Sequence, residues 1–358
     1  MLRSVCAILL AFLAGATRSQ TLLAVDFEKA GTGAYAYAQV QADWPGVTWQ
    51  NGLTEGRGSI AAGDSVSGTR SLRVAYPKGS VGPTEGGAQW RVFLAGNHDT
   101  VTMSYRVRFG SDFDFVKGGK LPGLCGSKCN TGGDVPQDTD GWSARLMWRD
   151  SVGRAVQYLY FPGQPGTYGL DLPWTVNGKN CLFGRGVWHE VRTRVILNTP
   201  RRGSGAALHD GRVTSWFDGA LALDSGGFLF RGVDTMHVNH FYVSTFHGGS
   251  DPTWAPSRDV SALFDGFAIV AGSVPPTAIA ASTGRQLSRW RLSVHRSVME
   301  FEPAAPSGSV LELRDLSGRL LSRTPANGAF VISAGLAAWR LCRADGALLD
   351  AGLALAMR

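Results

Sequence analysis

Thr100-Val-Thr-Met-Ser-Tyr-Arg-Val-Arg-Phe109 is the stretch of this chain that decides its fold. Its apolar side chains occupy every second position from Val101 to Phe109, and threonine, serine and arginine occupy the positions between them. Because successive side chains of a β-strand point to opposite faces, this alternation is typical of an antiparallel strand with one buried face. The stretch therefore predicts a half-buried strand.

Comparable runs follow one another from Leu22 to Val270, separated by Gly, Pro, Asn and Asp, and helical periodicity is scarce. One of them, Trp216-Phe-Asp-Gly-Ala-Leu, predicts a hairpin, because Asp-Gly between apolar residues favours a type I′ turn. Many short strands without intervening helices indicate an all-β protein. We expect a jelly-roll β-sandwich over residues 21–271.

The composition changes near Pro275-Pro276, where serine, alanine and threonine also become frequent, and we interpret 272–284 as a linker. Residues 285–358 return to short strand patterns such as Val310-Leu-Glu-Leu-Arg, which predict a small Ig-like β-sandwich. These motifs resemble the C-terminal sorting or attachment modules of secreted bacterial enzymes. An accessory β-domain without that role fits the pattern equally well.

The N-terminal segment has the order of a secretory signal peptide. Arg3 precedes an apolar run from Val5 to Ala14, and small residues follow. The run is too short to span a bilayer, and an uncleaved anchor or a buried helix is the weaker alternative. We therefore expect residues 1–20 to be a cleaved signal peptide. The protein would be secreted or held at the cell surface by its C-terminal module, without a membrane span.

The chain carries a formal net charge of +7, which indicates an acidic partner such as an anionic glycan, a nucleic acid or a membrane surface. Its arginines are spread singly rather than gathered in a basic run, and export also argues against nucleic acid. We therefore expect an anionic polysaccharide and no nucleic acid as the partner.

Four cysteines remain outside the signal segment: Cys125, Cys129, Cys181 and Cys342. An even number of cysteines in an oxidising compartment favours pairing. Cys125 and Cys129 are close enough to bond to each other, or one of them could reach Cys181, while Cys342 lies apart as a candidate free thiol. No histidine or further cysteine occurs nearby at metal-ligand spacing, so we expect neither a metal nor another cofactor.

Lysines gather in one segment of a chain that otherwise uses arginine. There are six lysines against twenty-nine arginines, yet Lys117, Lys120 and Lys128 fall within twelve residues. Lysine is a compact cation whose pKa shifts readily on burial, and the glycines around these lysines allow close backbone approach. A solvated loop is the plain alternative. A phosphate-binding loop fits poorly, because no Ser or Thr follows the lysine.

Two further segments place functional groups at alternating positions. Ser143 and Arg145 share one face of a predicted strand whose other face is apolar, and Tyr158 and Tyr160 share one face of another. Taken singly, the arginine could simply face solvent and the tyrosines could be packed aromatics. Together they describe a sheet surface with cations and phenols, which suits an anionic polymer.

In this order and at these intervals, Lys120-Leu-Pro-Gly, Gly141-Trp-Ser-Ala-Arg and Tyr158-Leu-Tyr resemble polysaccharide lyase family 14. This family contains alginate lyases of marine molluscs and algal-virus lyases that act on alginate and glucuronan. The resemblance covers roughly residues 85–270 and is strongest over 115–161. It implies a β-jelly roll with the active groove across one sheet.

The resemblance assigns catalytic roles to five residues: Lys120, Ser143, Arg145, Tyr158 and Tyr160. We expect three further side chains to contact the substrate: Lys117, Trp148 and His247. The segment 125–140 departs most from the family pattern in its length and its cysteines.

The chemistry of a lyase calls for these groups. The enzyme must remove the weakly acidic C5 proton of a uronate and expel the O4 leaving group, and neutralising the carboxylate acidifies that proton. Lys120 and Arg145 are suited to hold the carboxylate, with Ser143 positioning it. Tyr158 and Tyr160 can supply the base and the acid if nearby cations lower their pKa values. The sequence leaves open which tyrosine does which.

Other candidate sites are weaker. His237 and His240 have helical rather than strand spacing and lack a third metal ligand. Asp138 and Asp140 could form half of a glycoside hydrolase pair or bind calcium, but they occur in a loop rich in Gly, Pro and Asp. We interpret these residues as structural or solvated.

The sequence thus predicts an exported, monomeric polysaccharide lyase that cleaves a polyuronate, either alginate or glucuronan, by β-elimination. Two alternatives come from other classes. One is a catalytically silent glycan-binding jelly roll with the same groove, and the other is a glycoside hydrolase on a similar sandwich.

Overall fold

The computed structural model describes residues 20–63, 65 and 68–272 with their side chains, and beyond these the backbone of seven strands between 291 and 356. The expected signal peptide, 1–20, and the expected linker, 272–284, lie almost entirely outside the described residues. Within the described part of the chain, no helix is both long and apolar enough to cross a membrane.

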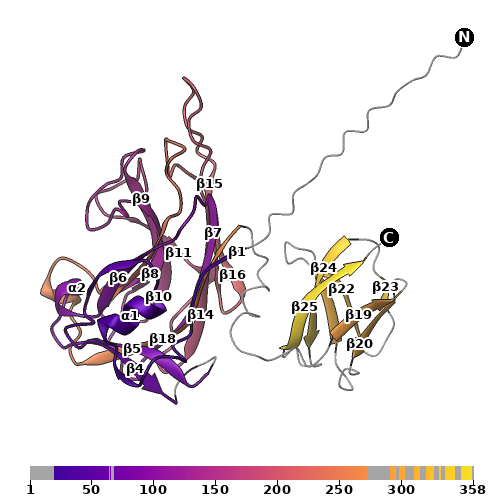
Figure 1. Ribbon diagram of the computed structural model, residues 1–358, viewed down its shortest axis with the longest axis horizontal. Coiled ribbons are helices and arrows are strands. Elements are labelled where there is room, and N and C mark those ends of the chain that lie inside the picture. The colour runs from indigo at the N-terminus through magenta and orange to yellow at the C-terminus, as the bar shows by residue number, and fades with distance from the viewer. Residues whose placement is uncertain are drawn as a thin grey trace, which may run out of the picture.

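Residues 20–272 form two antiparallel sheets that face each other across one hydrophobic core (Figure 1). The strands of the first sheet are, in spatial order, β16 (Ala220–Phe228), β15 (Gly211–Phe217), β14 (Trp188–Ile196), β7 (Thr100–Phe109), β18 (Val260–Ala271), β5 (Arg70–Tyr76), β4 (Gly58–Ala62) and β2 (Gly33–Ala34), with β1 (Gln20–Val25) paired to β18. The strands of the second sheet are β11 (Leu170–Pro173), β10 (Arg154–Tyr160), β9 (Gly141–Arg149), β8 (Gly118–Ser127), β17 (His240–His247), β6 (Ala88–Phe93) and β3 (Val47–Asn51). The remaining elements are α1 (Tyr37–Asp43), α2 (Gly82–Glu85), the 3-10 turn η1 (Pro252–Trp254), and the pair β12 (Thr175–Val176) and β13 (Lys179–Asn180). This is the jelly-roll sandwich that the sequence predicted.

Strand β7 shows why the alternating pattern produces this fold. Its apolar residues from Val101 to Phe109 are all fully buried. Phe109 meets Trp148 of the opposite sheet edge-on, with ring centroids 5.3 Å apart. One face of β7 therefore builds the core between the sheets, as the period of two predicted.

The hairpin between β15 and β16 is also confirmed. Phe217 pairs with Ala220, so only Asp218 and Gly219 form the turn. Their φ angles are 49° and 79°, the two positive values that a type I′ turn requires.

Cys125 and Cys129 form a disulfide, which settles one of the two pairings that the sequence left open. Cys181 is a free, buried thiol, so the alternative pairing to Cys181 is wrong. Cys342 lies on a strand whose side chains are outside the described residues.

The C-terminal segment contains two further antiparallel sheets. One consists of β19 (Arg291–His295), β20 (Val298–Glu302) and β23 (Phe330–Val331). The other consists of β22 (Leu320–Pro325), β21 (Val310–Arg314), β24 (Gly335–Cys342) and β25 (Leu348–Ala356). The strand predicted from Val310 onward is present, paired across a hairpin to Leu320–Pro325.

Candidate active site

The second sheet carries all five predicted catalytic side chains on the face turned away from the core. In the register of β9 and β10, Arg145 lies opposite Tyr158 and Ser143 lies opposite Tyr160. The alternate side chains of β9, among them Trp142, belong to the core. Burial of these side chains fixes which way β9 faces, and so directs serine and arginine outward.

Lys120 joins this group from the neighbouring strand β8, where it lies opposite Met147 of β9. Its Nζ is 3.0 Å from the Met147 Sδ and 4.0 Å from the centroid of the Tyr158 ring. Burial, together with the nearby charges of Arg145 and Arg149, holds the pKa of the Lys120 amine well below its usual value. The site therefore favours the neutral amine.

Arg145 is 1% exposed and is anchored by hydroxyl groups. Its Nη1 donates to the Ser244 Oγ at 3.1 Å and its Nη2 donates to the Thr131 Oγ1, while its Nε has no partner. Burial lowers the pKa of this guanidinium, but arginine stays charged at any physiological pH. Gly123 permits this packing, because a Cβ there would lie 2.3 Å from the Arg145 Cα.

The two tyrosine hydroxyls lie 3.4 Å apart. Each also accepts a backbone hydrogen bond: Tyr158 from the Gly169 N–H at 3.2 Å and Tyr160 from the Gly133 N–H at 3.1 Å. Burial and the bond to Tyr160 raise the pKa of Tyr158, against the opposing effects of Arg145 and Gly169. Tyr158 is therefore held as a neutral phenol.

Positive charge at this site has little acidic compensation. Among the described residues, neither Lys120 nor Arg145 forms an ion pair with a carboxylate. The next arginine along β9, Arg149, does: its Nε and Nη2 bond to both carboxylate oxygens of Asp171, at 2.7 and 2.9 Å. The Arg145 guanidinium near the tyrosines thus remains available for an anionic ligand, with the Lys120 amine beside it.

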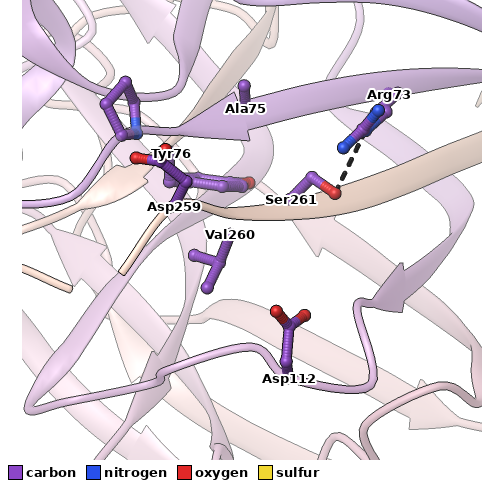
Figure 2. Close-up of a pocket in the computed structure, with 8 residues that line it drawn as sticks. Arg73, Ala75, Tyr76, Asp112, Asp259, Val260 and Ser261 are labelled. Atoms are coloured by element: carbon purple, nitrogen blue, oxygen red, sulfur yellow. Dashed lines mark hydrogen bonds between the residues drawn. The ribbon is translucent and has the colours of Figure 1, made fainter. Parts of the chain in front are cut away.

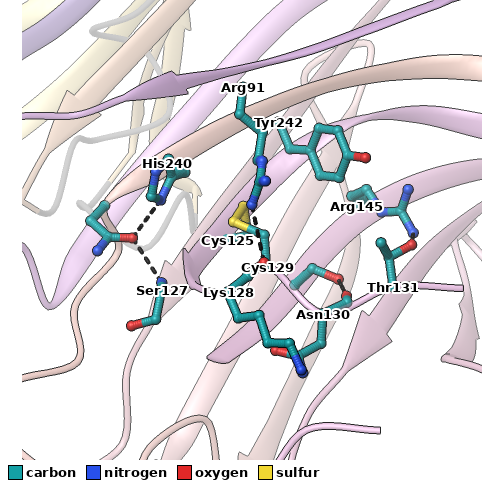
Figure 3. The surroundings of a disulfide bond; sticks show 12 residues. Arg91, Cys125, Ser127, Lys128, Cys129, Asn130, Thr131, Arg145, His240 and Tyr242 are labelled. Atoms are coloured by element: carbon teal, nitrogen blue, oxygen red, sulfur yellow. Dashed lines mark hydrogen bonds between the residues drawn. A yellow bond between two sulfur atoms is a disulfide. The ribbon is translucent and has the colours of Figure 1, made fainter. Parts of the chain in front are cut away.

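The loop 128–140 covers part of this face and is tied at its start by the disulfide (Figure 3). Three of its residues bond to predicted catalytic groups. The Asn130 carbonyl accepts from the Ser143 Oγ at 2.7 Å, Thr131 accepts from Arg145, and the Gly133 N–H donates to Tyr160. Ser143 and Tyr160 are consequently fully buried.

Lys117 lies at the rim of the same region. It is exposed, its Nζ donates to the Thr253 Oγ1 at 2.5 Å, and it lies 5.9 Å from the centroid of the Trp254 ring. Trp254, on η1, is partly exposed beside it. Lys117 is therefore accessible but separate from the buried cluster around Arg145.

The expectation that Trp148 and His247 contact the substrate is corrected by the structure. Trp148 is fully buried on the core side of β9, where its Nε1 donates to the Phe115 carbonyl at 3.1 Å. His247 is 1% exposed, and its Nε2 lies 2.7 Å from the Asp114 carbonyl. Both rings pack among core aromatics, 5.3 Å from each other, so neither reaches the outer face.

Sequence reasoning missed three aromatic or cationic residues on this face: Arg149, Tyr242 and Arg91. Arg149 continues the alternation of Ser143 and Arg145 along β9, and that signal was available. Tyr242 is the outward residue between Phe241 and Val243, which are core residues of β17. Arg91 lies on β6, a strand that the sequence pattern did not single out.

The weaker candidates have structural partners, as the sequence interpretation supposed. Asp138 accepts a bond from Arg201, and His237 pairs with Asp99 at 2.9 Å. His240 bonds to Asn239 at 2.8 Å. In the part of the chain that the structure describes, no three His, Cys, Asp or Glu side chains cluster as metal ligands.

A cavity of about 330 Å³ lies elsewhere, beside β5 and β18 of the first sheet (Figure 2). It is lined by Arg73, Ala75, Tyr76, Pro77, Asp112, Asp259, Val260 and Ser261. The Arg73 Nε donates to the Ser261 Oγ at 3.1 Å across its wall. None of the five predicted catalytic residues lines it.

Comparison with known proteins agrees with this fold. The family model described as Polysaccharide lyase 14 matches residues 64–267. Alginate lyase Aly36B is 26% identical over 70% of this chain and 96% of its own length, with a TM-score of 0.59. Variants of Aly36B have been solved in complex with alginate trisaccharide and tetrasaccharide.

Two more distant structures share the fold. The marine PL-14 alginate lyase from Aplysia kurodai is 24% identical over 71% of this chain and 100% of its own, with a TM-score of 0.58. Alginate lyase vAL-1 from Chlorella virus is 23% identical over 64% of this chain and 94% of its own, with a TM-score of 0.52. No curated protein sequence matches the chain. Since the family match spans more than half of the chain, and Aly36B is matched over nearly its whole length, the chain belongs to the polysaccharide lyase 14 family and is a polysaccharide lyase.

Proposed function

We propose that this lyase is exported and cleaves a polyuronate, alginate or glucuronan, by β-elimination. The observation that carries the proposal is the meeting of a guanidinium without an acidic partner, Arg145, and a lysine amine, Lys120, with two phenols on one sheet face. The phenols are those of Tyr158 and Tyr160. The alginate complexes of Aly36B support a substrate of this class.

Arg145 is proposed to hold the carboxylate of the uronate at the cleavage point. A guanidinium presents donors that match a carboxylate, and such charge-assisted bonds are stronger than neutral ones. Neutralising this carboxylate acidifies the C5 proton, because the charge that develops on its removal spreads onto the same group. Ser143 would help to position the carboxylate. Its hydroxyl now donates to the Asn130 carbonyl of the loop 128–140.

Elimination removes one proton from the sugar, at C5, and adds one proton to the leaving group, at O4. A base takes the C5 proton, the electron pair of that bond forms the C4–C5 double bond, the C4–O4 bond breaks, and an acid protonates O4. The raised pKa of Tyr158 suits the acid, because the phenol keeps its proton until the leaving oxygen needs it. The lowered pKa of Lys120 suits the base. Tyr160, whose hydroxyl is bonded to Tyr158, is the alternative base.

Substrate entry requires the loop 128–140 to move. Ser143, Arg145 and Tyr160 are at most 1% exposed, and each is bonded to this loop. A polymer can reach them only when those bonds open. The loop would then act as a cover that excludes water once it closes over the sugar.

The test is to incubate the exported protein with polymannuronate, polyguluronate and glucuronan while following the ultraviolet absorbance of the unsaturated product. We expect absorbance to rise with at least one of the three polymers. Binding without new absorbance would favour the glycan-binding alternative. New reducing ends without the chromophore would favour a glycoside hydrolase.

Export has its own test. Mass spectrometry of the protein recovered from outside the cytoplasm of an expressing bacterium should give a chain that lacks approximately the first twenty residues of the sequence. A full-length chain retained in the cytoplasm would contradict this part of the proposal.

A further inference from the structure

Another cation without an acidic partner among the described residues lies on the outer face of the second sheet, away from Tyr158 and Tyr160. Arg91 of β6 lies opposite Tyr242 of β17, and Tyr242 lies opposite Gly123 of β8. On the other side of Gly123, Arg145 of β9 lies opposite Tyr158 of β10. We infer that Arg91, held between Trp49 and Tyr242, binds the carboxylate of a uronate unit remote from the scissile bond.

The guanidinium of Arg91 is positioned by two rings. Its Cζ lies 5.3 Å from the centroid of Trp49 and 5.9 Å from that of Tyr242. One donor, Nη1, bonds to the Lys128 carbonyl at 3.1 Å (Figure 3). Among the described residues no carboxylate pairs with Arg91, so its remaining donors can bind a ligand. This contrasts with Arg149, whose charge is matched by Asp171.

Tyr242 connects this position to the catalytic cluster. The Cζ of Arg145 lies 5.2 Å from the same ring, so two guanidiniums flank one tyrosine (Figure 3). The Tyr242 hydroxyl donates to the Gln89 Oε1 at 2.7 Å, which fixes the ring, and the Cys125–Cys129 disulfide packs against it. The spacing of the two cations is therefore set by rigid neighbours.

A polyuronate carries one carboxylate on every sugar unit. A chain that crosses the strands from β10 to β6 would pass Arg145 first and then Arg91. Because both guanidiniums lie against the Tyr242 ring, their central carbons are at most about 11 Å apart. The intervening position has no cation, only the ring of Tyr242. Arg91 is therefore placed to bind a carboxylate a few sugar units from the one that Arg145 holds.

The groups around Arg91 are neutral or apolar, which suits the binding of a sugar that carries a carboxylate. His240, which lies opposite Phe93 on the neighbouring strand, has its pKa lowered to about 4 by burial and by Arg91, so it is neutral near pH 7. Phe93, on the same strand, is 50% exposed and packs edge-on against His240. Neutral and apolar groups around one cation are typical of sites that bind an anionic sugar.

The inference rests on the proposed function and predicts a dependence on substrate length. Arg91→Gln removes the charge and keeps a polar side chain near the Lys128 carbonyl, and Arg91→Lys keeps the charge. The matched control is Arg73→Gln, because Arg73 is an exposed strand arginine on the first sheet. Each variant is assayed on polymannuronate, polyguluronate and glucuronan, and on their oligosaccharides of increasing length.

We expect Arg91→Gln to raise KM on the polymers about five- to tenfold, as for loss of one charged contact at a partly exposed site, with kcat nearly unchanged. The shortest cleavable oligosaccharides should be unaffected, Arg91→Lys should recover most of the loss, and Arg73→Gln should match the wild type. An equal loss on all lengths would mean that Arg91 acts only through the loop, and no loss on any length would also overturn the inference. If the wild-type enzyme cleaves none of these substrates, the proposed function fails instead. Binding by Arg91 can then still be tested by electrophoresis of the protein in gels that contain polyuronate. The inference expects the polymer to slow the migration of the wild type and Arg91→Gln to abolish that effect.

Discussion

Lys120 lies in surroundings that disfavour its own positive charge. Two arginines lie near its amine, and its nearest contacts are a sulfur and an aromatic ring. A lysine that only attracted carboxylates would be better placed in solvent, where it would stay charged. The position therefore suits an amine that accepts a proton and then passes it on.

Lys120→Arg separates these two roles. Arginine can hold a carboxylate but cannot give up its proton, because its pKa exceeds about 12. We expect kcat to fall about a hundredfold or more, with a smaller change in KM, measured by the absorbance of the unsaturated product. Lys179→Arg, on β13, is the control. Near-normal kcat in Lys120→Arg would show that the residue serves only as a cation.

Tyr158→Phe tests the proposed acid. Removing the hydroxyl leaves the ring that contacts Lys120 but takes away the proton for O4, so we expect kcat to fall about a hundredfold. Tyr37→Phe, on α1, removes a phenol that packs against the core and should leave kcat unchanged. Full activity of Tyr158→Phe would move the role of the acid to Tyr160 or to water.

Alternation along single strands predicted much of this site and also explains where the prediction failed. Ser143, Arg145 and the two tyrosines face one way because their neighbours are apolar, and that is visible in the sequence. The same alternation places Trp148 and His247 on the buried faces of β9 and β17. Their assignment as substrate contacts was therefore wrong, and the alternation that shows this is visible in the sequence. The bonds from the loop to Tyr160 could not be foreseen, because no periodicity governs that loop.

At the scale of elements, strand β17 has one face turned outward, toward the candidate active site, and the other turned into the core. Its outward residues include Tyr242 and Ser244, and its inward residues end in His247, which lies among aromatic rings. The Nδ1 of His247 is buried without a partner, so a second proton there would have no acceptor. Burial accordingly lowers the pKa of His247 to about 4.

This burial makes the stability of the fold sensitive to acid. The folded-state pKa of His247 is below the ordinary 6.5, so its contribution is complete above about pH 6.5 and is lost as the pH falls towards 4. Between pH 7 and pH 5 we expect this histidine alone to cost about 2 kcal/mol of unfolding free energy, and His240 adds to it with the same sign. In urea titrations, His247→Gln should show a correspondingly smaller difference between the two pH values. His209→Gln, in an exposed loop, should behave like the wild type.

The disulfide at the start of the loop 128–140 is the second element-scale feature. Closing so short a loop contributes about 2 kcal/mol by the chain-entropy argument, and here it also supports Tyr242. We expect Cys125→Ser/Cys129→Ser to lower the unfolding free energy by about that amount and to raise KM. Dithiothreitol should reproduce the change in the wild type and have no effect on the double variant. Equal stability of the two proteins would contradict the prediction.

At the scale of the whole molecule, the sandwich was predictable because its strands are half-buried and its turns carry their own signals, as at Asp218-Gly219. The pairing order was not, since β17 lies between β8 and β6 although more than a hundred residues separate it from either. Contacts between such distant segments are decided by the packed core. An active groove across the sheet was therefore expected only through the family resemblance.

Removing the C-terminal strands tests whether the lyase domain is complete without them. The family match ends at residue 267, and Aly36B is covered over 96% of its length by 70% of this chain. We expect a protein that ends at residue 272 to keep the kcat/KM of the full chain on polyuronate, measured at equal concentration of folded protein. A large loss would show that the C-terminal sheets contribute to catalysis.

The bonds between the loop 128–140 and Ser143, Arg145 and Tyr160 have a calorimetric consequence. Each hydrogen bond that a sugar makes to these groups replaces one that the loop already makes, so binding is an exchange of partners. The heat released should then be small, and affinity should come mainly from displaced solvent and released counter-ions. Titration of an inactive variant with a long oligosaccharide should accordingly show a near-zero enthalpy and an affinity that falls as salt is added.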